Sequence, residues 1–196
     1  MISNFKFQIP NSKKGITIVE VIVTIFIITM FSGIIISDFP KVRKRFALST
    51  AAHNLAQDLR RAQDMGLSGV QLVDVGGEEL PVKGFGLYIN LNSIGGNKRY
   101  IIYGDSNGNE QYDYDIDYDL YLIDMNNETK GVIIEGLYNV LESRHVSINF
   151  SPPNPKTSIS GLEEGMSRIK IILALESDTA TTREVYVNTS GLIETK

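Results

Sequence analysis

One carboxylate interrupts the most apolar part of this sequence. Residues 16–37 read ITIVEVIVTIFIITMFSGIIIS, and Glu20 is the one ionisable side chain among them. An ionised carboxylate inside a lipid bilayer costs about 2.5 to 3.5 kcal/mol on insertion scales. Two interpretations follow, because Glu20 either reaches water at the headgroups or meets a positive partner. A buried carboxylate with a cationic partner is chemistry suited to assembly between chains.

The second group of residues with chemical potential is the acidic segment 104–119, which reads GDSNGNEQYDYDIDYD. Oxygen ligands of this kind suit calcium, and positions 1, 3, 5 and 9 of an EF-hand-like loop would be Asp105, Asn107, Asn109 and Asp113. The glycine is Gly108, at position 4 instead of position 6, and position 12 is Ile116. The segment is therefore a calcium site or an acidic, solvated hairpin loop, and we favour the loop.

Four tyrosines are interleaved with these acids, namely Tyr112, Tyr114, Tyr118 and Tyr121. We expect them to pack along the edge of a strand. The alternative is a stacking platform for sugars or bases, and the acidic surroundings argue against bases.

Patterns that carry catalysis are missing from the sequence. The chain has no cysteine, which excludes disulfides, thiolate zinc sites and cysteine nucleophiles. It has no Gly-rich phosphate loop with its lysine, no nucleophile elbow and no HExxH helix. We therefore expect no enzymatic activity and no cofactor, with calcium as the one alternative.

The charge is unevenly distributed along the chain. The formal net charge is −4, but the residues after Arg45 include 12 basic and 21 acidic side chains, a balance of −9. Nucleic-acid binding depends on Lys and Arg displacing counterions from phosphates, so a domain this acidic is a poor partner for DNA.

These residues must be positioned by a long helix and a set of strands. Residues 16–37 match the roughly 20 residues that cross a bilayer as a helix. We expect this helix to bend or pause near Pro40 and then to continue with an amphipathic period that ends at Gly66 or Gly69. Its apolar face would carry Val42, Phe46, Ala52, Leu55, Leu59, Ala62 and Met65.

From residue 70 the pattern changes to short apolar or alternating runs between turn formers, which predicts strands. The candidates are residues 70–75, 85–91, 99–103, 120–124, 132–137, 146–150, 168–175, 184–188 and 192–194. The expected fold class is α+β, in which a long N-terminal helix packs on an antiparallel sheet.

The residues around the start of the apolar run match a specific pattern. Lys13, Lys14 and Gly15 precede ITIVEVIV, and this resembles the class III signal of type IV prepilins and pseudopilins. The resemblance implies that a prepilin peptidase cuts after Gly15 and methylates the new amine of Ile16. It also implies that Glu20 faces the α-amine of a neighbouring subunit in a filament.

Two further segments are similar to the GspH/FimT-type minor pseudopilins. They are ALSTAAHNLAQDLRRAQDMGLS, with the basic pair Arg60 and Arg61, and the closing EVYVNTSGLIE. The chain departs from many type IV pilins at Ser37, where those proteins have proline, and Pro40 comes three places later.

The resemblance implies a domain organisation and a location. It divides the chain into a cleavable leader at residues 1–15, a transmembrane half-helix at 16–40, an amphipathic half-helix at 41–69 and a β-rich domain at 70–196. The protein would be a single-pass plasma (inner) membrane protein with a cytoplasmic N-terminus and an extracytoplasmic, pilin-like domain. It would enter a filament after assembly.

The expected function is that of a structural, minor subunit of a type IV pilus or of a type II secretion or competence pseudopilus. Its partners would be other pilin or pseudopilin subunits, the prepilin peptidase, the inner-membrane assembly platform and the membrane. The first alternative is a binding module displayed on such a filament, an adhesin or a DNA receptor stabilised by calcium. A membrane-anchored, calcium-dependent assembly factor is the other.

Overall fold

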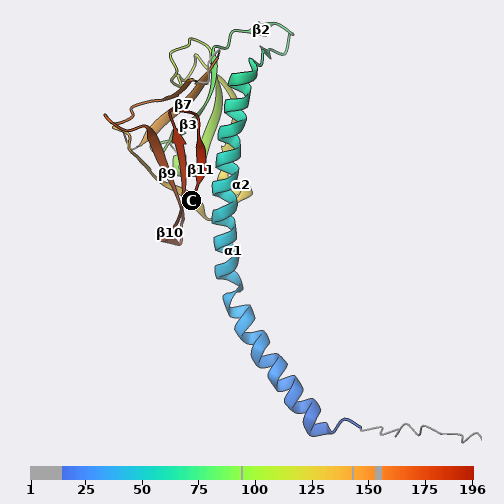
Figure 1. Cartoon of the computed structure of the whole chain (residues 1–196). Coiled ribbons are helices and arrows are strands. Elements are labelled where there is room, and N and C mark those ends of the chain that lie inside the picture. The colour runs from blue at the N-terminus through green and yellow to red at the C-terminus, as the bar shows by residue number, and fades with distance from the viewer. Residues whose placement is uncertain (1–14, 94, 143, 153–155) are drawn as a thin grey trace, which may run out of the picture. The chain divides into compact units, whose positions relative to one another are not determined.

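The computed structural model describes residues 15–93, 95–142, 144–152 and 156–196, and its fold is α+β (Figure 1). A long helix, α1 (Ile18–Ser68), comes first, and all the longer strands follow it and pair in antiparallel fashion. The chain forms two compact units, residues 1–42 and residues 43–196, and α1 contributes to both. This agrees with the predicted combination of a long N-terminal helix and antiparallel strands.

Helix α1 is continuous over 51 residues, and Pro40 lies inside it. The helix therefore does not pause at Pro40, although proline removes one backbone hydrogen bond there. The helix ends where Gly69 takes a left-handed φ of 60°, and Val70 N donates to the Met65 carbonyl over 3.4 Å. A glycine in this conformation is a common way to close a helix, and it confirms the predicted end.

The second unit buries one face of α1, and this face begins later than the sequence predicts. Its fully buried side chains are Leu48, Ala51, Ala52, Leu55, Ala56, Leu59 and Ala62. Phe46, which we expected on this face, is 68% exposed, and Val42 is exposed as well. The helical period is right, but the core formed with the strands begins at Leu48, so the apolar residues before it have no side-chain layer to pack against.

A five-stranded sheet has the strand order β5-β4-β3-β7-β8. Its strands are β3 (Gly84–Asn90), β4 (Arg99–Asp105), β5 (Tyr118–Asp124), β7 (His145–Ser151) and β8 (Lys156–Ile159). Strand β8 was not predicted. Its run KTSI is short, with three polar residues of four, and pairing of Ile148 with Ile159 and of Phe150 with Thr157 fixes it on β7.

A four-stranded sheet has the order β11-β10-β9-β6. It consists of β6 (Val132–Tyr138), β9 (Arg168–Leu175), β10 (Asp178–Asn188) and β11 (Ile193–Thr195). A separate two-stranded hairpin, β1 (Leu72–Val73) with β2 (Glu79–Leu80), follows α1, and short turns of helix occur at η1 (Gly96–Lys98) and α2 (Met125–Glu128). The expected closing hairpin is confirmed, because Val187 pairs with Ile193.

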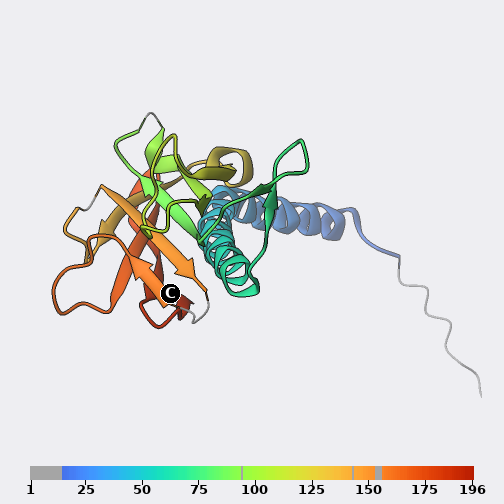
Figure 2. The ribbon, with the colours of Figure 1, turned by 90° about the horizontal axis from the view of Figure 1, so that it is seen from above.

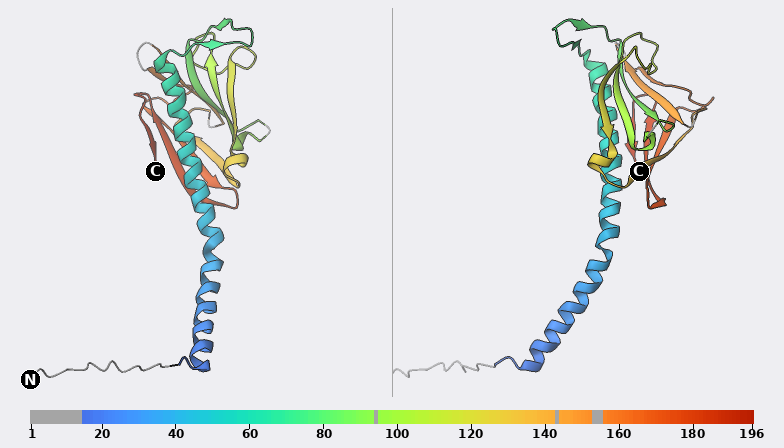
Figure 3. Two further views of the ribbon diagram at one scale, coloured as in Figure 1. Left: turned by 90° about the vertical axis from the view of Figure 1, so that its right-hand side faces the viewer. Right: turned by 180° about the vertical axis from the view of Figure 1, so that it is seen from behind.

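Within the second unit, α1 contacts both sheets. On one flank, Arg60 donates to the Ile193 carbonyl over 3.2 Å and Gln63 donates to the Gly191 carbonyl over 2.9 Å. On the other flank, the Tyr100 hydroxyl donates to Asp58 over 2.6 Å. Figures 2 and 3 show the longer strands grouped against this half of the helix. One buried core, which includes Leu55, joins this face of the helix to the inner faces of both sheets.

Candidate functional site

The predicted site begins in the last residues before α1. Gly15 and Ile16 are exposed, Ile16 to 76%, and a Cβ added to Gly15 would meet no atom within 4 Å. The basic pair Lys13 and Lys14, which the resemblance makes part of the leader, lies outside the described residues. The bond after Gly15 is therefore exposed and uncrowded among the described residues.

Thr17 is the N-terminal cap of α1, and it connects directly to Glu20. The Thr17 hydroxyl accepts a hydrogen bond from Glu20 N over 3.2 Å, and the Thr17 carbonyl accepts the first helical bond from Val21 N over 3.2 Å. Thr-x-x-Glu is the sequence of a capping box, in which a threonine cap satisfies a free N–H of the first turn. This cap was present in the sequence as a recognisable signal, and the sequence analysis missed it.

Glu20 lies in the first turn of α1. The free N–H groups at the start of a helix carry partial positive charge, and a carboxylate placed there is stabilised by about 0.3 to 1 kcal/mol. This is less than the roughly 2.5 to 3.5 kcal/mol that an ionised carboxylate costs in lipid. The helix terminus therefore offsets part of the cost, and the remainder requires water or a cation.

The first half of α1 is apolar, and none of its faces packs against another part of the described chain. All side chains described between residues 15 and 46 are exposed, and one 18-residue window has a mean hydropathy of 2.5, long and apolar enough to cross a membrane. Its two threonine hydroxyls bond to the helix itself, since Thr24 donates to the Glu20 carbonyl over 2.7 Å and Thr29 donates to the Phe26 carbonyl over 2.9 Å. Such bonds let a hydroxyl exist in lipid without an outside partner.

The acidic segment forms the connection between β4 and β5, and its carboxylates bond to its own backbone. Asp105 is fully buried and accepts from Gly108 N over 2.6 Å and from Glu110 N over 2.9 Å. Asp117 accepts from Ser106 N over 2.9 Å and from Asp113 N over 2.7 Å. The segment is a hairpin connection, as expected; Asp115 and Asp119 are exposed, Glu110, Asp113 and Asp117 are half-buried, and Asp105 alone of its acids is buried.

Two of the four calcium-ligand candidates converge on a third. Asn107 and Asn109 both donate through their amide groups to Asp113 Oδ2, over 2.7 and 2.6 Å. Glu110, at the position where an EF-hand has glycine, has a left-handed φ of 64°. Within the described residues, no three His, Asp or Glu side chains are grouped so as to hold a metal ion. In the structure, the amides of Asn107 and Asn109 hold the Asp113 carboxylate within the loop.

The buried end of this segment depends on a distant strand. Asn149 on β7 donates to Asp105 Oδ2 over 3.3 Å and to the Tyr103 hydroxyl over 3.3 Å. Burial raises the pKa of Tyr103 above its ordinary value. No local signal in the sequence connects residues 105 and 149, so this anchor could not be predicted.

The four tyrosines lie in two different settings. Tyr118 and Tyr121 lie on β5, an edge strand, and the Arg61 guanidinium lies 3.9 Å from the centre of the Tyr121 ring. Tyr112 and Tyr114 lie in the connection before β5. Two of the four therefore lie on a strand edge, and the other two belong to the outer side of the five-stranded sheet.

Charged and aromatic side chains alternate on the outer face of the four-stranded sheet. Register places Tyr138, Lys170, Tyr186 and Glu194 side by side across β6, β9, β10 and β11. The Arg168 guanidinium lies 4.9 Å from the Tyr186 ring. Pairing of β9 with β10 brings the cations Arg168 and Lys170 close to the closing hairpin, with Glu184 and Glu194 among them.

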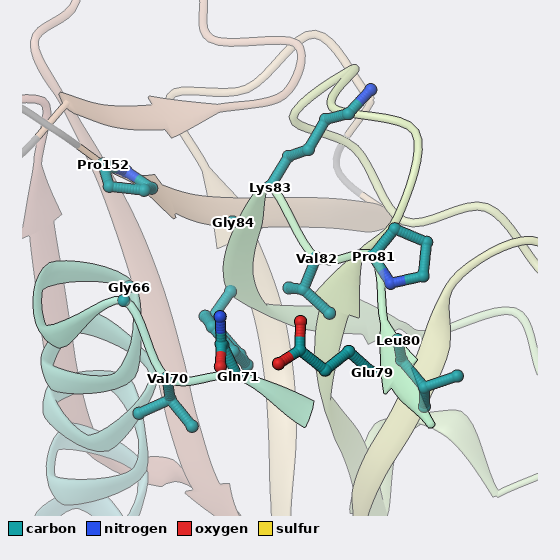
Figure 4. A pocket seen from close by; sticks show the side chains of 12 residues that line it. Gly66, Val70, Gln71, Glu79, Leu80, Pro81, Val82, Lys83, Gly84 and Pro152 are labelled. Carbon is teal, nitrogen blue, oxygen red and sulfur yellow. The ribbon is translucent and has the colours of Figure 1, made fainter. Parts of the chain in front are cut away.

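A hollow of about 460 Å³ lies between the end of α1 and the chain that leads into β3 (Figure 4). Its lining includes three glycines, Gly66, Gly69 and Gly84, and apolar residues such as Leu80 and Val82. In Figure 4, Glu79 and Gln71 extend into the hollow, and Lys83 points away from it, toward the Asn107 carbonyl to which it donates over 2.9 Å. No arrangement of nucleophile, base and acid lines this hollow.

The two predicted groups of site residues belong to different units of the chain. Gly15, Ile16 and Glu20 lie in the first, and the acidic segment lies in the second. No family model, no curated protein and no solved structure matches this chain.

Proposed function

We propose that this chain is a structural subunit, of the minor kind, of a type IV pilus-like filament or pseudopilus. One observation carries the proposal: Glu20 stands in the first turn of an apolar helix without a covered face, five places after a Lys-Lys-Gly cleavage signal. The helix needs an apolar environment on all sides. Neighbouring helices in a filament and lipid before assembly both supply one.

The chemistry of the start of α1 suits this function. Cleavage after Gly15 creates an α-amine at Ile16, four residues before Glu20 and immediately before the capped first turn of α1. A subunit whose carboxylate is short of positive charge gains free energy when the amine of a neighbour reaches it, because a buried charge is tolerated only when it is paired. In this proposal the leader is cytoplasmic, and the β-rich second unit lies outside the membrane.

A binding module displayed on the filament is the second candidate. The cations on the outer face of the four-stranded sheet favour a DNA receptor, but acids are interspersed with them: Lys170 Nζ lies 3.8 Å from Glu184 Oε1. The net balance of −9 after Arg45 also opposes a phosphate backbone. Structural assembly therefore has the stronger support.

Two substitutions test the proposal in cells that carry a matching prepilin peptidase. Gly15→Ala should block cleavage and leave a product longer by 15 residues in intact-mass measurement, because the peptidase requires glycine before the cut. Glu20→Ala should be cut and methylated normally but should be missing from sheared filaments.

Gly33→Ala is the matched control for both variants. It makes the same exchange as Gly15→Ala, in the same apolar region, and an added Cβ meets no atom within 4 Å. It should be processed and assembled like the parent chain. Normal maturation of Gly15→Ala, or filaments that incorporate Glu20→Ala at the parental level, would overturn the proposal.

A further inference from the structure

The outer face of the five-stranded sheet carries a second hollow, distinct from everything the assembly function uses. It has a volume of about 400 Å³ and lies over β3, β4 and β5. Ligand pockets in proteins span roughly 300 to 1,000 Å³ and combine apolar walls with a few polar groups. Four tyrosines line it, the largely buried Tyr100 and the more accessible Tyr88, Tyr112 and Tyr114, together with Ile101 and Leu122.

The central tyrosine is held in place from several directions. The Tyr112 ring stacks on Tyr88 with centroids 4.4 Å apart and meets Tyr103 edge-on at 5.2 Å. Its backbone N donates to the Ser147 hydroxyl over 3.0 Å, and its own hydroxyl donates to Asp119 over 2.8 Å. A ring fixed in this way can receive a ligand without losing further conformational entropy, which is the advantage of a preorganised site.

Two other residues that line the hollow, Tyr114 and Leu122, are more exposed to solvent than the packing of the fold explains. The Tyr114 side chain is 77% exposed and Leu122 is 62% exposed, although both are large apolar groups that gain free energy by leaving water. In contrast, Tyr100 and Tyr103, which also belong to this sheet, are almost fully buried. An open aromatic surface beside a fixed one favours a partner with apolar faces.

The polar groups at the rim indicate that this partner is uncharged. Arg99 Nε lies 2.9 Å from Asp124 Oδ2, so the cation that lines the hollow is already paired. Two planar groups at the rim can also bond hydroxyls: Asp119, whose Oδ1 accepts from the Tyr112 hydroxyl, and Asn90, whose Oδ1 accepts from Asn92 N. Because the hollow offers no unpaired cation among its described residues, and the surrounding domain is acidic, an anionic ligand such as a nucleic acid or a phosphate is disfavoured.

A smaller hollow of about 330 Å³ adjoins the first and shares Tyr88 and Tyr112 with it. Its other walls include the uncharged hydrogen-bonding residues Gln111, Ser147 and Ser160, and also Glu142, whose carboxylate lies 2.9 Å from His145 Nε2. The stacked tyrosines therefore separate two neighbouring hollows, one more apolar and one more polar. A ligand that fills both has at least two rigid units in a row.

We propose that this groove binds a neutral oligosaccharide of two or more sugar rings. A pyranose ring has a flat face of C–H groups that packs on a tyrosine ring, and its hydroxyls match planar acceptors and donors such as Asp119, Asn90 and Gln111. The inference goes beyond the assembly function, since none of these residues belongs to α1. It gives the filament subunit a ligand on the outer side of its second unit.

The experiment uses the full chain in a detergent without a sugar headgroup, so that the detergent does not compete. Lactose, chitobiose, cellobiose and maltose are titrated while tyrosine emission is recorded, which is readable because the chain has no tryptophan. Saturation-transfer NMR reports the bound sugar protons. At least one disaccharide should saturate the signal, and Tyr114→Ala should weaken its binding about tenfold.

Two variants separate stacking from other effects. Tyr114→Phe keeps the ring and should bind within about threefold of the parent chain. Tyr138→Ala removes an exposed tyrosine from the other sheet and should bind like the parent. All three variants should keep the parental melting midpoint and should still be processed and assembled, so that failure here leaves the filament proposal standing.

Three results would overturn the inference. The first would be that none of the four disaccharides saturates the signal, and the second that Tyr114→Ala binds as tightly as the parent chain. The third would be that Tyr138→Ala loses as much affinity as Tyr114→Ala. Saturation by single-stranded DNA or by tetramethylammonium in place of the sugars would also overturn it, and would assign the groove to bases or to cations.

Discussion

Individual residues at the start of α1 explain how a carboxylate can be accommodated in the first turn of an apolar helix. Thr17 fixes the first turn by accepting from Glu20 N, and the helix terminus stabilises negative charge at Glu20. Both effects are local, so the spacing Thr-x-x-Glu in the sequence was enough to indicate them. The anchor of the acidic segment is different, because Asp105 and Asn149 are 44 residues apart and only strand pairing brings them together.

Glu110 gives a prediction about pH. Its ion pair with Lys156, at 2.8 Å, lowers the pKa of the Glu110 carboxyl below its ordinary value. A lowered pKa in the folded state stabilises the fold above the unfolded-state pKa, and this contribution is lost as the pH falls. Glu110→Gln should therefore cost up to about 1 kcal/mol near pH 7 and nothing once the carboxyl is protonated.

The measurement is urea unfolding of parent and variant at several pH values. Glu142→Gln is the matched control, because Glu142 is an exposed acid whose partner is His145 and not a lysine. A difference between Glu110→Gln and the parent that grows on acidification would contradict the assigned ion pair.

Gly66 gives a prediction about close packing. A Cβ at this position would collide with the backbone carbonyl oxygen of Phe150 on β7, and a backbone atom in a sheet cannot move aside cheaply. Gly66→Ala should lower the free energy of unfolding of the second unit by about 1 to 3 kcal/mol. Gly33→Ala, the same exchange in open space on the same helix, should leave it unchanged. Equal stability of the two variants would show that α1 does not approach β7 this closely.

At the scale of elements, the sequence predicted those with a strong period and missed those without one. The alternating run RIKIILAL gave β9 with its observed bounds, and the helical period gave the buried face from Ala52 to Ala62. Strands β2 and β8 have two and four residues, and tertiary pairing defines them more than composition does. The division of the strands into two sheets also depends on long-range pairing, which a local pattern does not contain.

In the second unit, the helix and the sheets should unfold together in a single cooperative transition. Leu55 is fully buried in the core that joins them, so Leu55→Ala should cost about 2 to 5 kcal/mol of unfolding free energy. Leu67→Ala changes a leucine of the same helix that is 47% exposed, and it should cost far less. Thermal unfolding followed by circular dichroism measures both. Two separate transitions in the Leu55→Ala protein would show that helix and strands unfold independently.

At the scale of the whole molecule, apolar surface and charge belong to different parts of the chain. The exposed apolar side chains of α1 crowd the first unit, whereas 21 of the 23 acids come after Arg45. Composition alone predicted this division. Repulsion among the acidic second units favours their remaining apart in water, and the apolar first unit opposes solubility.

A fragment of residues 46–196 should therefore be soluble without detergent and sediment as a monomer. The full chain should require detergent or lipid, because the window with a mean hydropathy of 2.5 remains in it. Analytical ultracentrifugation at low and physiological salt measures both states. Large homopolymers of the fragment would contradict the role of the first half of α1 as the element that drives assembly.

The continuity of α1 has a mechanical consequence. The helix that begins at Ile18 supplies Leu48, Leu55 and Leu59 to the interior of the second unit, and it stays helical through Pro40 although the proline removes one backbone hydrogen bond. A force on the N-terminal end is therefore delivered along the helix axis to side chains locked between two sheets, where it acts in shear. Pulling the helix out would expose all three leucines to water at the same time. Under force, the second unit should therefore unfold in one cooperative step and not residue by residue.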